Sequence, residues 1–243
     1  MKLRRLLLLP PADPGLAQGG WFFFASLFLF FFSQAFLAGW AGKGRPAVPL
    51  QVRLFCGVWL AASLPILAAG MGTREGWRAL GIAPGKFRLR AVLGGAAIYS
   101  AGLVFWFPLF TAYFQLLHLL GVQRTPQPVY KWIAENPAGA NPDLFLLLLV
   151  VFVLPFFEEL AFRGLIQSWF RKVMPRGWAL VGTAALFGLA HDPWIMKFPV
   201  FLLGLFFGYA RERTGSLWAS WAAHVLHNAL VVVLAPYFIQ FYD

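Results

Sequence analysis

Two adjacent carboxylates and a guanidinium, Glu158, Glu159 and Arg163, follow an uncharged apolar run over residues 144–157. An ionised side chain at membrane depth costs at least about 2.5–3.5 kcal/mol, so such residues need a partner or a function. On a helix, Glu159 and Arg163 are four residues apart and share a face, whereas Glu158 points about 100° away. We therefore expect Arg163 to hold Glu159 and leave Glu158 available for proton transfer. An ion pair between Glu159 and Arg163 that serves packing alone stays open as an alternative.

Four further polar residues lie in the apolar second half of the chain, namely His191, His224, His227 and Asn228. Because lipid does not solvate such side chains, they tend to turn inward and meet. A carboxylate beside a histidine can take a proton from water, which suits Glu158. His224 and Asn228 are one helical turn apart, so both can donate hydrogen bonds to a developing oxyanion. The pattern predicts one shared, buried polar pocket.

The histidines also have structural interpretations. His191 precedes Asp192 and Pro193, so it can end a helix or lie in a hydrated turn. His224 or His227 can donate a hydrogen bond between helices, which is a common role of histidine in membrane bundles. His227 lies three residues from His224, and we expect it only to support the site.

The composition predicts a membrane protein. Hydrophobic residues make up 60% of the 243 residues and charged residues only 12%, and the mean hydropathy is +0.70. Soluble domains carry roughly 25% charged residues. The formal charge of +11 comes from basic residues scattered between hydrophobic runs, which argues against nucleic-acid binding. The single cysteine, Cys56, has no partner for an internal disulfide bond.

The elements that must position these residues are helices. We expect an all-α, polytopic transmembrane helical bundle of about seven to eight membrane segments with a buried polar active site. The segments are predicted at 21–40, 50–70, 91–121, 144–170, 178–191, 198–210 and 216–241. The fifth and sixth are short for a core of about 30 Å, so we expect a hairpin that crosses only part of the membrane.

The chain is expected to form one integrated membrane domain. Residues 1–143 would hold about three spans, and residues 144–243 would form the catalytic core. The start is basic, and its apolar run is too short for a cleavable signal peptide. The stretches 71–90, 171–177 and 211–215 are net basic, which predicts a cytoplasmic N-terminus.

Three motifs occur in order on successive apolar segments. They are Glu-Glu-x-x-x-Arg at 158–163, Phe-x-x-x-His at 187–191 and His-x-x-x-Asn at 224–228. Together they resemble the CPBP family, the bacterial intramembrane endopeptidases related to type II CAAX prenyl proteases and also called the Abi family. The resemblance covers about residues 144–233.

The resemblance implies a peptidase with assigned roles. Glu158 and His191 would activate a water molecule for attack on a peptide carbonyl, and His224 and Asn228 would hold the oxyanion. Two further residues would support the site, Glu159 and Arg163. The expected partners are membrane lipid and a membrane-associated peptide or protein substrate, and the expected location is the bacterial plasma membrane.

Two alternatives stay open. A zinc protease would use Glu158, His191 and His224 as ligands, although the sequence has no His-Glu-x-x-His motif. We prefer activation by glutamate and histidine without a cofactor. A non-catalytic peptide-binding scaffold or a transporter would use the same pocket, but the chain shows no clear internal repeat of the kind many transporters have.

Overall fold

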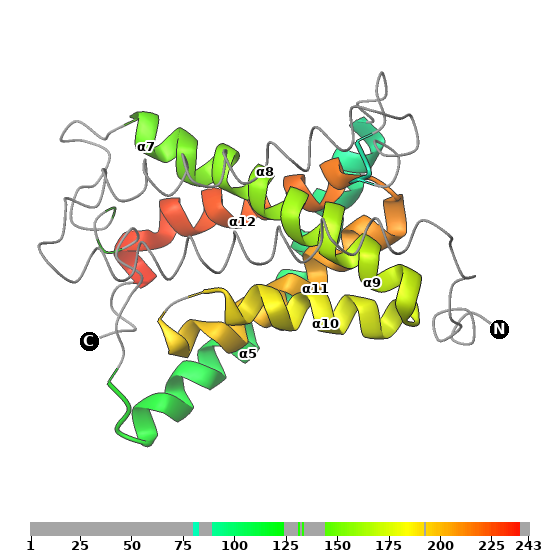
Figure 1. Ribbon diagram of the computed structural model, residues 1–243. Helices are drawn as coiled ribbons and strands as arrows, with labels where there is room; N and C mark the ends of the chain where they lie inside the picture. The colour runs from blue at the N-terminus through cyan, green and yellow to red at the C-terminus, as the bar shows by residue number, and fades with distance from the viewer. Residues whose placement is uncertain are drawn as a thin grey trace, which may run out of the picture.

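A computed structural model describes residues 80–82, 89–123, 131, 133, 144–191 and 193–238 of the chain, and every regular element within these ranges is a helix. Figure 1 shows the helices lying side by side, with α5 slanting away from the others at one end. The predicted segments 21–40 and 50–70 lie outside the described residues. The all-α class is therefore confirmed for the described part, whereas the number of membrane segments stays a prediction.

Helix α5 (Leu89–Leu119) corresponds to the predicted segment 91–121, and Pro108 lies inside it. It packs closely against α12, since a Cβ atom on Gly95 would lie 1.9 Å from the Ala219 carbonyl oxygen. Its other face exposes large apolar side chains, among them Val104 and Phe105. An exposed apolar face of this length is typical of a helix that contacts lipid.

The segment with the glutamates is one continuous helix with two wider, π-helical stretches. Its parts are α7 (Leu144–Leu148), η1 (Leu149–Val153), α8 (Leu154–Glu159), η2 (Leu160–Ile166) and α9 (Gln167–Val173). The amide of Leu154 donates to the Leu149 carbonyl, five residues back. In the same register the Val150 carbonyl would accept from Pro155, which has no N–H group. The Val150 carbonyl therefore needs a partner from outside this helix.

A helical hairpin comes next along the chain, and the predicted end of its second helix is wrong. Helix α10 (Arg176–Leu189) has 14 residues, about 21 Å at 1.5 Å per residue. However, η3 (Trp194–Met196) and α11 (Lys197–Thr214) together form a 21-residue candidate membrane span. The predicted end at Ala210 is too early because the charged turn after it stays helical. The helix ends at Gly215, whose φ of 67° is left-handed.

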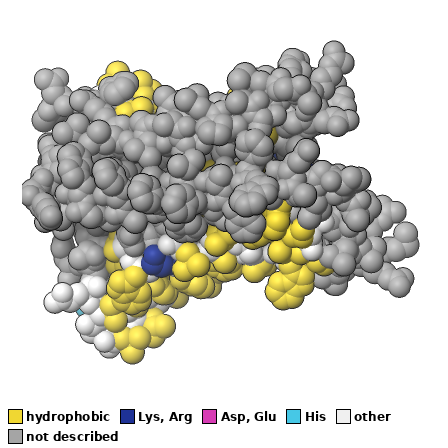
Figure 2. Space-filling view, viewed as in Figure 1, with side chains coloured by type: hydrophobic (Ala, Val, Ile, Leu, Met, Phe, Trp, Pro, Cys, Tyr) yellow, Lys and Arg dark blue, Asp and Glu magenta, His cyan; other side chains and the backbone are white. Residues whose placement is uncertain are grey.

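Helix α12 (Leu217–Phe238) packs against α5, α11 and the helix that carries the glutamates. Aromatic side chains fill the core between them, including the buried Tyr99, Trp106, Phe187 and Phe207. The described part contains three helices long and apolar enough to cross a membrane: Leu89–Leu119, Trp194–Thr214 and Leu217–Ala235. Figure 2 shows hydrophobic side chains over most of the described surface visible in that view.

Candidate active site

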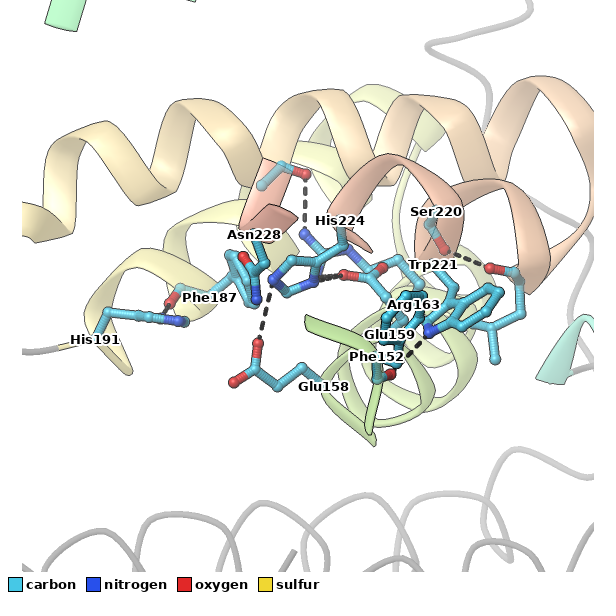
Figure 3. Close-up of polar contacts among 12 residues, drawn as sticks. Phe152, Glu158, Glu159, Arg163, Phe187, His191, Ser220, Trp221, His224 and Asn228 are labelled. Atoms are coloured by element: carbon cyan, nitrogen blue, oxygen red, sulfur yellow. Dashed lines mark hydrogen bonds and ion pairs between the residues drawn. The ribbon is translucent and has the colours of Figure 1, made fainter. Parts of the chain in front are cut away.

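His224 lies between the two adjacent glutamates. Its Nδ1 is 2.9 Å from Oε1 of Glu159, and its Nε2 is 3.6 Å from Oε2 of Glu158. Because a carboxylate oxygen accepts, we assign Nδ1 as the donor to Glu159. The imidazole ring stacks on Phe207 at 4.6 Å between ring centroids. Figure 3 shows Glu158 reaching His224 from one side, while Glu159 and Arg163 lie on the other. Residues 65 positions apart therefore meet in one buried site.

Arg163 fixes the second glutamate. Both side chains are 0% exposed, and Nη1 of Arg163 donates to Oε1 of Glu159 over 2.9 Å, as the sequence predicts. Nη2 of Arg163 donates to the Gly204 carbonyl oxygen on α11. The guanidinium also lies 4.2 Å from the ring centroid of Phe187, at a distance typical of a cation–π contact. Glu159 is thus held by two donors. Glu158 is 12% exposed and, among the residues that the structure describes, has only the longer contact with His224.

Asn228 supplies the hydrogen-bond donor that the Val150 carbonyl lacks within its own helix. Its Nδ2 donates to the Val150 carbonyl oxygen over 2.9 Å, which supplies the hydrogen bond that Pro155 cannot give. This contact uses one of the two hydrogens on Nδ2. The second hydrogen of Asn228 remains for another acceptor, one turn along α12 from His224.

His191 follows α10 and is oriented by its own helix. Its Nδ1 is 2.7 Å from the Phe187 carbonyl oxygen. Since a carbonyl only accepts, Nδ1 carries the hydrogen, and Nε2 of the neutral ring is then an acceptor. His191 and Glu158, both within the described part of the chain, make no direct hydrogen bond with each other. Figure 3 places His191 beside Phe187, on the far side of that ring from Arg163.

His227 faces α5 and does not touch the glutamates. Its Nδ1 is 3.0 Å from the hydroxyl oxygen of Tyr99, and its ring meets the edge of Trp106 at 5.4 Å between centroids. Sequence reasoning missed Tyr99, because a tyrosine in an apolar span has no distinctive spacing. The structure therefore brings Glu158, Glu159, Arg163 and His224 together directly, places His191 and Asn228 beside them, and gives His227 a neighbouring interface.

The described residues do not group three His, Cys, Asp or Glu side chains closely enough to bind a metal ion. Of the set considered for zinc, Nε2 of His224 and Oε2 of Glu158 are 3.6 Å apart, and His191 makes no hydrogen bond to either of these two described residues. The described residues therefore contain no preformed zinc ligand set, and chelation experiments test the zinc alternative.

Comparison with protein-family models matches residues 140–230 to the type II CAAX prenyl endopeptidase Rce1-like family. The matched segment contains all three motifs, so the resemblance inferred from them is confirmed over this stretch. Comparison with curated proteins and with solved structures gave no match. The match and the three candidate spans identify an integral membrane protein with a protease-like segment.

Proposed function

We propose that this chain, with its type II CAAX endopeptidase-like segment, is an intramembrane endopeptidase that cleaves a membrane-associated protein or peptide. One observation carries the proposal: a buried histidine, His224, is held between two adjacent carboxylates, and within the described part of the chain an arginine fixes Glu159 but not Glu158. That arrangement separates a carboxylate that positions the site from a carboxylate free to move a proton. The family match supports the reaction class.

Water activation falls to Glu158 and His191. Glu158 takes a proton from a water molecule while the water oxygen attacks the carbonyl carbon of the scissile bond. His191 presents Nε2 as an acceptor, because Nδ1 is bound to the Phe187 carbonyl. The tetrahedral intermediate collapses as the C–N bond breaks, and the proton taken from water passes to the leaving amine nitrogen. No external oxidant or reductant is needed for this sequence.

Oxyanion stabilisation falls to His224 and Asn228. In the imidazolium form both ring nitrogens of His224 carry hydrogen, so Nδ1 donates to Glu159 and Nε2 donates to the oxyanion. Asn228 has the second Nδ2 hydrogen, since the first is bound to Val150. Removing one such donor typically lowers the rate by about 10²–10³. Glu159 and Arg163 support this step by fixing the imidazole of His224 in place.

We also propose the partners and the location of the protein. Membrane lipid and a peptide or protein substrate are the partners, and no nucleic acid takes part. We propose a bacterial plasma membrane as the location, with the N-terminus on the cytoplasmic side. The net basic stretches 171–177 and 211–215 support a cytoplasmic position for that end of the bundle. A zinc-dependent protease with the same residues and a peptide-binding scaffold or transporter are the alternatives that the experiment must separate.

The test is cleavage of a library of membrane-associated peptides by purified protein in liposomes. Native protein is compared with Glu158→Gln and His191→Gln, and His118→Gln, at the exposed end of α5, is the matched control. We expect native protein and the control to cleave the same peptide and both site variants to lose cleavage. Full activity of Glu158→Gln would overturn the proposal. A peptide that binds without being cut would favour the scaffold, and a loss on chelation that zinc restores would favour the metal enzyme.

A further inference from the structure

Three donors on the glutamate-bearing helix meet three acceptors on α11 in one register. Arg163 donates to the Gly204 carbonyl, Gln167 to the Gly208 carbonyl and Arg171 to the Glu212 carboxylate. Both sets are spaced by four residues, and each contact joins positions 41 apart. The two helices therefore run in the same direction, and we call these six residues the polar ladder.

The polar ladder continues into the candidate active site without a break. Arg163 binds Glu159, which in turn accepts from His224. At the other end, Nε2 of Gln167 also donates to Oε1 of Glu212 over 3.1 Å. Hydrogen bonds thus join Arg163 to Glu159 at the site, and they join Gln167 and Arg171 to Glu212 at the basic end of the bundle, where α9 and α11 end.

A cavity of about 230 Å³ lies along the polar ladder, and all seven side chains that line it are polar or charged. Its lining includes Arg163, Gln167, Ser168 and Arg171. Three buried atoms of this lining, Nε of Arg163, Oε1 of Gln167 and Nε of Arg171, have no hydrogen-bond partner within the described part of the chain.

A dry cavity of this kind is unfavourable, because a buried polar atom without a partner loses the hydrogen bonds that it makes with water in the unfolded chain. Water meets this need when a polar cavity is large enough, and one water molecule occupies about 30 Å³ of liquid. The cavity therefore has room for several water molecules. Its outer end is reachable from solvent, because the side chains of Arg171 and Glu212 are 30% and 14% exposed.

We propose that this cavity is a water inlet: water enters beside Arg171 and Glu212, fills the space along the polar ladder and reaches Arg163, from which it passes to the hydrolytic site. Hydrolysis inside a membrane consumes one water molecule per peptide bond, and lipid does not supply it. Arg163 belongs both to the cavity lining and, through Glu159, to the site. The supply role rests on the proposed protease function, whereas the hydration of the cavity does not.

The hydration is tested by thiol labelling in liposomes, in a Cys56→Ala background that removes the single native cysteine. Ser168→Cys places a thiol in the cavity lining. The first control is Val181→Cys, since Val181 lies on α10 and is 40% exposed. It follows Leu180, whose Cδ1 would lie 2.5 Å from a Cβ atom on Gly208, so this control lies close to the polar ladder. The second control is Thr183→Cys, which is buried. A small anionic methanethiosulfonate is the probe, because it dissolves in water and not in lipid.

We expect Ser168→Cys to react at least about tenfold faster than both controls, since the reactive thiolate forms in water. A neutral, lipid-soluble reagent should label Val181→Cys and so show that its thiol is intact. A Ser168→Cys rate no faster than that of Val181→Cys would overturn the water-filled cavity. This result needs no protease activity, so it is distinguishable from failure of the proposed function.

The supply role is tested on the labelled proteins. An adduct at Ser168→Cys fills the inlet and should lower the cleavage rate at least tenfold, while an adduct at Val181→Cys should not. The effect should appear in kcat, because the cavity lining includes none of the four proposed catalytic side chains. Complete labelling of Ser168→Cys with unchanged kcat would overturn the inlet.

Discussion

Replacing each of the two adjacent glutamates by glutamine should separate the stability of the site from its chemistry. Glutamine keeps the shape of glutamate and removes the charge. Glu159 is fully buried and accepts from Arg163 and His224 through Oε1. Glu158 is partly exposed, and its Oε2 lies 3.6 Å from Nε2 of His224. The same chemical change should therefore have opposite consequences at neighbouring positions.

The magnitudes depend on burial. Glu159→Gln leaves the buried guanidinium of Arg163 without the carboxylate at 2.9 Å, and removing one partner of a buried ion pair costs about 3–5 kcal/mol. In a chain of this length each kcal/mol lowers Tm by about 2–4 °C, so the expected loss is about 6–20 °C. Glu158→Gln loses a contact too long for a hydrogen bond, worth at most about 1 kcal/mol. It should abolish cleavage while leaving Tm within a few degrees of native.

The assay pairs thermal unfolding in detergent, monitored by tryptophan fluorescence, with cleavage measured well below the lower Tm. A double variant, Glu159→Gln with Arg163→Met, is the control for the mechanism. It removes both charges, so it should lose less stability than Glu159→Gln alone, because no buried charge is left without a partner. Equal Tm losses in the two glutamine variants, or a native Tm for Glu159→Gln, would refute the reasoning.

Three further outcomes are expected. Asn228→Ala leaves the Val150 carbonyl without its donor and should cost about 1–3 kcal/mol of stability as well as cleavage activity; a native Tm in detergent would contradict the role of this contact. Tyr99→Phe removes the hydrogen bond to His227 and should lower stability by about 1 kcal/mol with kcat nearly unchanged, and a large fall in kcat would instead make His227 part of the reaction. Exhaustive chelation should leave the cleavage rate within about twofold of native, and a loss that added zinc reverses would establish the metal alternative.

The central contacts of the site were predictable from residue types and spacing. Glu159 and Arg163 are four apart on a helix, and that spacing alone favours their pairing. The meeting of Glu159 with His224 is expected from a general constraint, since ionisable groups in apolar helices are solvated only by one another. Neither prediction needs the tertiary structure, because the alternative arrangement would place a charge in lipid.

Other features were not predictable in the same way. The end of α11 was predicted too early because the basic stretch 211–215 was interpreted as a cytoplasmic turn, whereas the helix continues until Gly215. The contact between Tyr99 and His227 depends on how α5 lies against α12, and no local pattern specifies it. Gln167 belongs to the four-residue series that includes Glu159 and Arg163, so this series was the signal available for the polar ladder.

The π-helical stretch Leu149–Val153 makes the helix tolerant of a change in residue count at one place. A π-helical turn holds about one residue more than an α-helical turn and still completes one turn. Deleting any one residue between 149 and 153 would let this turn close into α-geometry and leave Glu158 and Glu159 facing His224. In the α-helical residues 154–157 that follow, the same deletion would rotate the glutamates by about 100° relative to the preceding part of the helix.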